Sequence, residues 1–129
     1  MPPLLFLASA LAGNDPASAL DAVKACDRPA MSVIVRAEPH RRADWAASVY
    51  AEQQAIARDR AALLARQGSE TTPAGKASLE AALLQLDARQ KQLDDARAVE
   101  SSWRTMIDEL RADFLANCAQ GKGSIGGGK

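Results

Sequence analysis

The chain has 129 residues, with 16 lysines and arginines against 16 aspartates and glutamates, so its formal net charge is zero. This length suits one small domain rather than two independent cores. A nucleic-acid binder needs a cationic face to displace the counterions of phosphates, and the balanced charge argues against that class. Alanine is the commonest residue and aromatics make up 4%. Because alanine favours helix but buries little area, we expect long paired helices with a thin core.

The first twelve residues, 1–12, are predicted to be a signal peptide. Leu4 to Ala12 is an apolar run that is shorter than the about 20 residues of a membrane span but typical of a secretory signal. Cleavage after it leaves one helical-hairpin domain over 13–120 and a flexible glycine-rich tail over 121–129. We therefore expect a periplasmic or secreted protein without an integral membrane span. Met1-Pro2-Pro3 lacks the usual positive charge, so the alternatives are a cytoplasmic chain or a true start further upstream.

A short helix and a connector are expected next. Asp15-Pro16 is a helix start, because aspartate caps the first N–H groups and proline fits the first turn. This start predicts a helix over about 16–26. Arg28-Pro29 should end that helix, because the residue before a proline disfavours helical backbone. The consecutive β-branched residues 33–35 favour extended backbone. We expect residues 31–35 to form an extended connector that lies against a helix.

Two long helices follow the connector. Helical periodicity runs from beyond Pro39 to about Gln67, where Gly68 offers a left-handed stop. After a turn, Thr72-Pro73 repeats the cap-then-proline start. The chain then has neither glycine nor proline from Lys76 until Gly121. The second helix is therefore expected to be much longer than the first.

The pairing of the two helices can be read from their apolar residues. Large apolar residues recur at every seventh position on both helices. They are Val49, Ile56 and Leu63 on the first helix and Leu79, Leu86 and Leu93 on the second. Residues that face each other in an antiparallel pair have numbers with a constant sum, and these three pairs all sum to 142. The sequence therefore predicts a coiled-coil-like antiparallel hairpin with three apolar layers.

The two cysteines, Cys26 and Cys118, are expected to form a disulfide, as is usual in an exported chain. Beyond Leu93 the longer arm carries an apolar stripe over 103–115 that the shorter arm leaves uncovered. A bridge between the cysteines lays residues 26–38 along this stripe. The predicted fold is all-α: a long helical hairpin whose short N-terminal helix and extended connector are strapped to the longer arm by the disulfide. The alternative is two free thiols in a cytosolic protein.

The residue pattern gives no reason to expect catalysis, a cofactor or a metal site. His40 lacks the nucleophile and orienting acid of a catalytic base, and a zinc site using it with both cysteines lacks a fourth ligand. Asp108, Glu109 and Asp113 lie close on a helix surface, where carboxylates are not desolvated. The G-x4-G-K spacing of the tail lacks the serine or threonine, strand and helix of a phosphate-binding loop. We expect a non-enzymatic protein.

Two groups of residues are candidates for a partner surface. Arg41 and Arg42 lie at a predicted helix start and suit an acidic partner or an anionic envelope polymer, although a solvated helix start is the simpler explanation. Tyr50, Ala57 and Leu64 recur at heptad spacing on a second flank of the first arm. In a monomer this flank would be exposed to solvent. This stripe predicts an antiparallel homodimer with a four-helix arrangement. The expected function is an interaction or structural module with a protein partner; the alternatives are a periplasmic chaperone-like holdase and an inhibitor or immunity-type binding protein.

Overall fold

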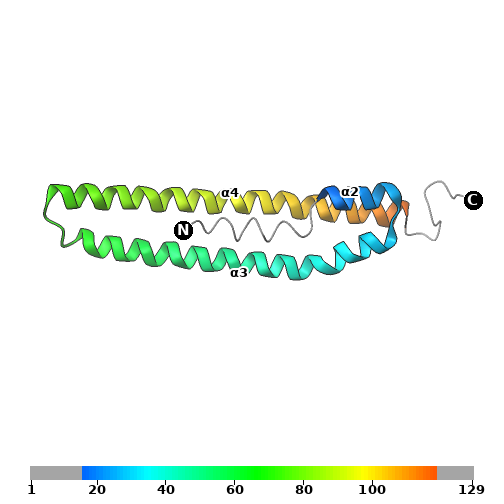
Figure 1. Cartoon of the computed structure of the whole chain (residues 1–129), viewed down its shortest axis with the longest axis horizontal. Helices are drawn as coiled ribbons and strands as arrows, with labels where there is room; N and C mark the ends of the chain where they lie inside the picture. Colours follow the sequence, from blue (N-terminus) through cyan, green and yellow to red (C-terminus); the bar gives the residue numbers. More distant parts are fainter. Residues whose placement is uncertain (1–15, 119–129) are drawn as a thin grey trace, which may run out of the picture.

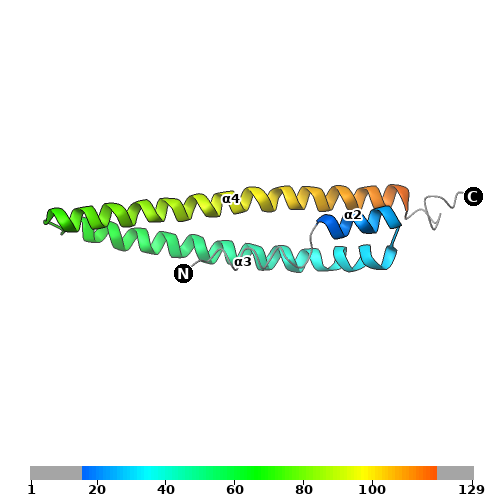
Figure 2. The ribbon, with the colours of Figure 1, turned by 45° about the horizontal axis from the view of Figure 1, so that its top comes forward.

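The computed structural model describes residues 16–118, and over that range it contains three helices and no strand. They are α2 (Pro16–Ala25), α3 (Arg28–Gln67) and α4 (Pro73–Asn117). Figure 1 and Figure 2 show α3 and α4 side by side along a rod, joined by a turn at one end, with α2 packed on them at the other. The predicted all-α hairpin with an N-terminal helix is confirmed.

Several predictions fall on residues that the structure does not describe. The signal peptide over 1–12, the helix cap Asp15 and the tail over 121–129 lie outside the described residues. The bounds 13–120 of the hairpin domain therefore stay a prediction. No helix in the described range is long and apolar enough to cross a membrane.

The predicted extended connector is wrong, because residues 28–38 are the first turns of α3. Asp27 caps this helix, since its carboxylate accepts a hydrogen bond from the Ala30 N–H at 3.1 Å and Pro29 sits in the first turn. Arg28-Pro29 thus begins a helix rather than ending one. Burial outweighs the extended preference of the β-branched residues, since Ile34 is only 7% exposed in the core.

The predicted inequality of the two arms is also wrong, since α3 has 40 residues and α4 has 45. Pro39 lies inside α3 instead of preceding it. A proline in a helix removes one backbone hydrogen bond and displaces the preceding turn, which bends the helix. Figure 1 shows α3 curving along its cyan N-terminal part. The helix therefore continues through the proline with a bend.

The turn between the long helices follows the prediction in part. Thr72 caps α4, because its hydroxyl accepts a hydrogen bond from the Gly75 N–H at 3.0 Å. Gln67 is the last residue of α3, as predicted. Gly68 is not a left-handed stop, since its φ is −66°. Helical hydrogen bonding continues past it, with the Glu70 N–H donating to the Arg66 carbonyl at 3.0 Å.

A left-handed stop occurs instead at Cys26, whose φ is 47°. The Asp27 N–H donates to the Ala22 carbonyl at 2.9 Å, and the Cys26 N–H donates to the Val23 carbonyl at 3.2 Å. These are the two hydrogen bonds of a Schellman helix end, whose left-handed position glycine usually occupies. The stop turns the chain from α2 into α3 and places Cys26 at the end of the rod.

The three predicted layers form the core where only α3 and α4 pair, which we call the two-helix end. Val49, Ile56, Leu86 and Leu93 belong to one buried cluster that also contains Trp45. Leu63 packs against this cluster partly buried, and Leu79 is buried as well. Contacts between the helices agree with the predicted sum of 142, since Gln53 bonds to Gln90 and Arg89 bonds to Glu52, pairs whose numbers sum to 143 and 141.

At the opposite end, which we call the three-helix end, α2 and α3 cover one side of the apolar stripe of α4. Ile107 and Phe114 are buried there, whereas Met106 and Leu115 stay 46% and 50% exposed. Two buried clusters hold these helices together and consist of Ala22, Met31, Phe114 and Cys118, and of Ala19, Ile34 and Ile107. The predicted disulfide joins Cys26 to Cys118, with 5.4 Å between their Cα atoms and 92 positions between them in sequence. Residues 26–38 lie along the stripe as predicted, but residues 28–38 are helix, and the stripe is covered only on the side of Ile107 and Phe114.

Replacing Cys118 with serine should loosen the three-helix end first. Closing a loop of 92 positions contributes up to about 4 to 5 kcal/mol in the chain-entropy model. Amide hydrogen exchange should speed up over α2 and residues 107–117 and stay close to wild type over 49–63 and 79–93. Wild-type protein under reducing conditions serves as a control and should show the same pattern. Uniform acceleration along both long helices would contradict this layout.

Candidate functional site

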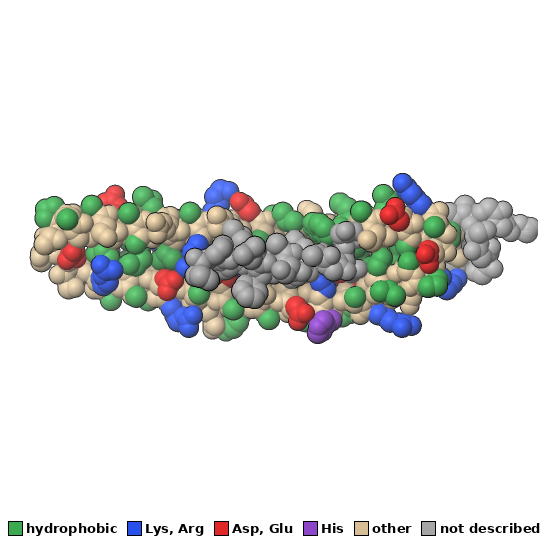
Figure 3. Space-filling model, in the orientation of Figure 1, with side chains coloured by type: hydrophobic (Ala, Val, Ile, Leu, Met, Phe, Trp, Pro, Cys, Tyr) green, Lys and Arg blue, Asp and Glu red, His purple; other side chains and the backbone are tan. Residues whose placement is uncertain are grey.

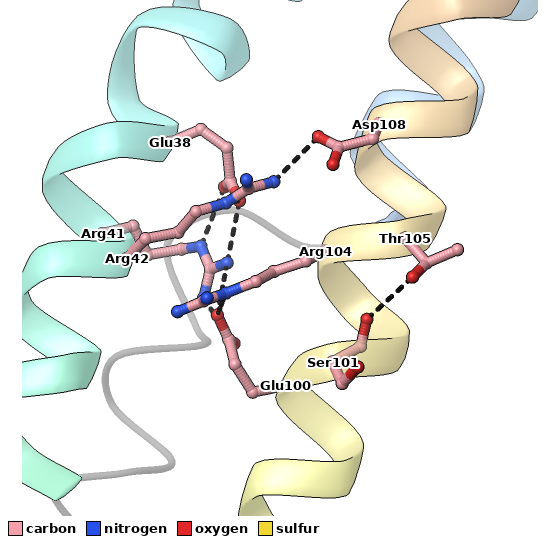
Figure 4. Close-up of polar contacts among 8 residues, drawn as sticks. All are labelled: Glu38, Arg41, Arg42, Glu100, Ser101, Arg104, Thr105 and Asp108. Carbon is pink, nitrogen blue, oxygen red and sulfur yellow. Dashed lines mark hydrogen bonds and ion pairs between the residues drawn. The ribbon is translucent and has the colours of Figure 1, made fainter.

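Six charged side chains meet between α3 and α4, where the two-helix end gives way to the three-helix end (Figure 4). We call this group the ion network. Its members are Glu38, Arg41 and Arg42 from α3 and Glu100, Arg104 and Asp108 from α4. Three cations face three carboxylates, so the network as a whole carries no net charge.

Arg41 forms the centre of the ion network. Its Nη1 and Nη2 donate to the two carboxylate oxygens of Glu100 at 2.8 and 3.0 Å. Its Nε and Nη2 donate to the two oxygens of Glu38, both at 2.8 Å. Arg41 and Glu38 are 6% exposed and Glu100 is 1% exposed. The hydrogen bond with Glu38 raises the pKa of Arg41; burial opposes that rise, and the hydrogen bond with Glu100 adds to it.

The other two arginines complete the pairing of the buried carboxylates. Arg42 Nε donates to Glu38 at 2.6 Å, and its Nη2 donates to Asp108 at 2.9 Å. Arg104 Nε donates to Glu100 at 2.6 Å, and its guanidinium carbon lies 5.6 Å from the centroid of a Trp45 ring. Each buried carboxylate therefore binds two guanidinium groups. The buried Trp45 Nε1 finds no acceptor within the described range.

The ion network was not predicted, although the sequence carries a signal for it. Glu100 follows Leu93 by seven residues and precedes Ile107 by seven, so it occupies a position of the buried heptad. Extending the sum of 142 puts Arg42 opposite Glu100, next to Arg41. The helical periodicity predicts that the first arm starts just beyond Pro39, so the paired layers of the hairpin are expected to end near that residue. Because α3 continues through the proline, the heptad continues with it.

This geometry corrects the candidate surface around Arg41 and Arg42. Both residues lie within α3 rather than at a helix start, because the helix begins at Arg28. Arg41 is buried and has no surface to offer a partner. Arg42 is half-buried and bound to Glu38 and Asp108. His40 is exposed, with its Nε2 3.2 Å from an Asp44 carboxylate oxygen.

Tyr50, Ala57 and Leu64, which we call the outer stripe, lie on the exposed flank of α3 as the spacing implied. Each follows a buried or half-buried core position by one residue, which turns it about 100° away from the core. Tyr50 is 66% exposed and Leu64 is 50% exposed. The Tyr50 hydroxyl accepts a hydrogen bond from Gln54 Nε2 at 3.0 Å. Self-association through this stripe stays a prediction.

The remaining polar groups do not converge on a reactive centre in the described part of the chain. Asp108 pairs with Arg42, whereas Glu109 and Asp113 are exposed. Within residues 16–118, no group of three or more histidines, cysteines or acidic residues could hold a metal ion. A groove of about 470 Å³ lies beside the ion network and is lined by Val35, Glu38, Pro39, Arg42, Ile107, Asp108 and Arg111.

The surface is mixed in charge. Figure 3 shows basic and acidic side chains scattered along the visible face of the rod, with apolar side chains between them. Comparison with protein-family models, with curated proteins and with solved structures finds no match to this chain. Its function is therefore inferred from its own residues.

Replacing Glu100 with alanine should destabilise the fold by up to about 3 to 5 kcal/mol, because the buried Arg41 guanidinium then keeps only Glu38 of its two carboxylate partners. Asp95→Ala is the matched control, since Asp95 is exposed and pairs only with the neighbouring-turn Lys91 at 2.8 Å among the contacts described. That change should cost less than about 1 kcal/mol. Urea unfolding followed by circular dichroism measures both. Equal losses for the two variants would show that the network is not a buried unit.

Proposed function

We propose that this protein is a non-enzymatic interaction or structural module of the periplasm or of a secreted compartment, and that it binds a protein partner through the exposed flank of α3. The observation that carries the proposal is the outer stripe. Tyr50, Ala57 and Leu64 lie in a row at heptad spacing and are exposed. Rows of apolar side chains on a helix are typical of helix-to-helix recognition.

The disulfide supports an exported location. A bond between Cys26 and Cys118 is compatible with an oxidising compartment, whereas thiols are kept reduced in most cytosolic proteins. The bond also ties α2 and the start of α3 to the end of α4. The disulfide links the helices at one end of the rod, and the turn between α3 and α4 links them at the other. The flanks of the rod are therefore held in a fixed arrangement. Such a scaffold suits a binding surface that must be preorganised.

The surroundings of the acidic residues support a function without catalysis. A catalytic carboxylate needs a desolvated cleft with a perturbed proton affinity. The two buried carboxylates, Glu38 and Glu100, are each bound by two arginines. The acidic residues Glu109 and Asp113 face solvent. Neither environment suits a general acid or base.

The experiment is a crosslinking capture from the envelope and periplasmic fraction of cells that produce the tagged full chain. Wild type should form a crosslinked adduct, either with a second copy or with another protein, and its two cysteines should resist alkylation. Tyr50→Lys/Leu64→Lys should lose the adduct, because lysines on the outer stripe are costly to bury. Val33→Lys is the matched control, since Val33 is also exposed on α3 but lies outside the stripe.

The proposal fails if no adduct depends on the stripe, that is, if the double variant and Val33→Lys give the same adducts as wild type. The proposed periplasmic or secreted location is wrong if the chain is found in the cytoplasm with two thiols that can be alkylated.

A further inference from the structure

We infer that the surface on α3 takes a second copy of this chain, packed antiparallel along the same face, an inference that rests on the proposed function. The outer stripe is part of a longer row on this face. Its positions alternate by three and four residues, as in a coiled-coil seam, and are Ala47, Tyr50, Gln54, Ala57, Ala61 and Leu64. All six side chains are exposed. We call this row the outer seam.

The order of large and small residues along the outer seam is complementary to its own reverse. An antiparallel pair with its twofold axis between residues 55 and 56 places Tyr50 opposite Ala61 of the second copy. The same axis places Leu64 opposite Ala47 and Gln54 opposite Ala57 of the second copy. Each large side chain therefore meets an alanine, and the twofold axis repeats each contact. Packing of large against small residues in facing layers fills the space between two helices.

A parallel pair in register lacks this complementarity. It would place Tyr50 against Tyr50 and Leu64 against Leu64 of the second copy, and alanine against alanine at the three small positions. Crowded and empty layers would then alternate along one seam, and both are unfavourable. The residue sizes therefore favour the antiparallel arrangement.

The charges beside the outer seam permit the same pairing. The flanking positions on α3 are 46, 53, 60 and 67 on one side and 51, 58 and 65 on the other. Arg58 and Arg60 are the charged residues among these seven positions. In the antiparallel pair, Arg60 lies near Gln53 and Arg58 lies near Ala51 of the second copy. Arg60 is also compensated by Asp87 of its own hairpin at 2.9 Å. No like charges are brought opposite each other along this flank.

The test is sedimentation equilibrium of the purified full chain with a pair of size-swapping variants. Wild type should dimerise in the micromolar range. Ala61→Tyr should weaken the dimer about tenfold or more, because it crowds Tyr50 of the second copy, and Tyr50→Ala should weaken it through lost burial. The double variant Tyr50→Ala/Ala61→Tyr exchanges the large and small partners and should recover most of the wild-type affinity. Val33→Ala is the control and should leave the affinity unchanged.

Circular dichroism of each variant verifies that the hairpin stays helical, as expected for substitutions at exposed positions. Wild type that remains monomeric at high micromolar concentration overturns the inference. A double variant that is weaker than both single variants overturns the antiparallel register. If the purified chain is monomeric but captures another protein through the outer stripe, this inference is wrong and the proposed function stands. If no adduct depends on the stripe, the proposed function itself is wrong.

Discussion

The constraint on which the rest of the structure depends is the pairing of Arg41 with two carboxylates inside the hairpin. Glu38 comes from the same helix and Glu100 from the other, and all three side chains are buried. The apolar layers are made of similar side chains at every seventh residue, so a displaced pairing could still bury them. It would separate Arg41 from Glu100, so that each of these buried charges would lose the partner that the other helix supplies. The ion network thus excludes packings that the apolar layers tolerate.

The remaining features follow from this single register. It places Cys118 beside Cys26 at the end of the rod, where the disulfide forms. It brings Ile107 and Phe114 under the alanines of α2, which close the three-helix end. It also leaves the outer flank of α3 without a neighbour among the described helices, so Tyr50 and Leu64 stay exposed. The proposed binding surface is therefore a consequence of how the interior is arranged.

Features with a strong periodic or local signal could be predicted from the sequence, namely the apolar layers, the disulfide, the Thr72 cap and the exposed outer stripe. The errors arise where local preference and tertiary packing disagree. Residues 33–35 favour extended backbone and Pro39 suggests a boundary, yet the Asp27 cap and the burial of Ile34 keep this segment helical. The ion network was missed because a charged residue at a heptad position is usually read as surface. A buried charge is recognised only when its partners on both helices are known.

A double-mutant cycle on Arg41 and Glu100 tests the central pairing most directly, using Arg41→Met, Glu100→Leu and the combination, with the free energy of unfolding measured in urea. Each single change takes away one of the two charged partners of a buried side chain, Glu100 from Arg41 or Arg41 from Glu100. The double change replaces this pair with apolar side chains. We predict that the double variant loses at least about 2 kcal/mol less than the sum of the two single losses. Single losses that add within about 0.5 kcal/mol would contradict it, because two side chains that do not meet behave independently.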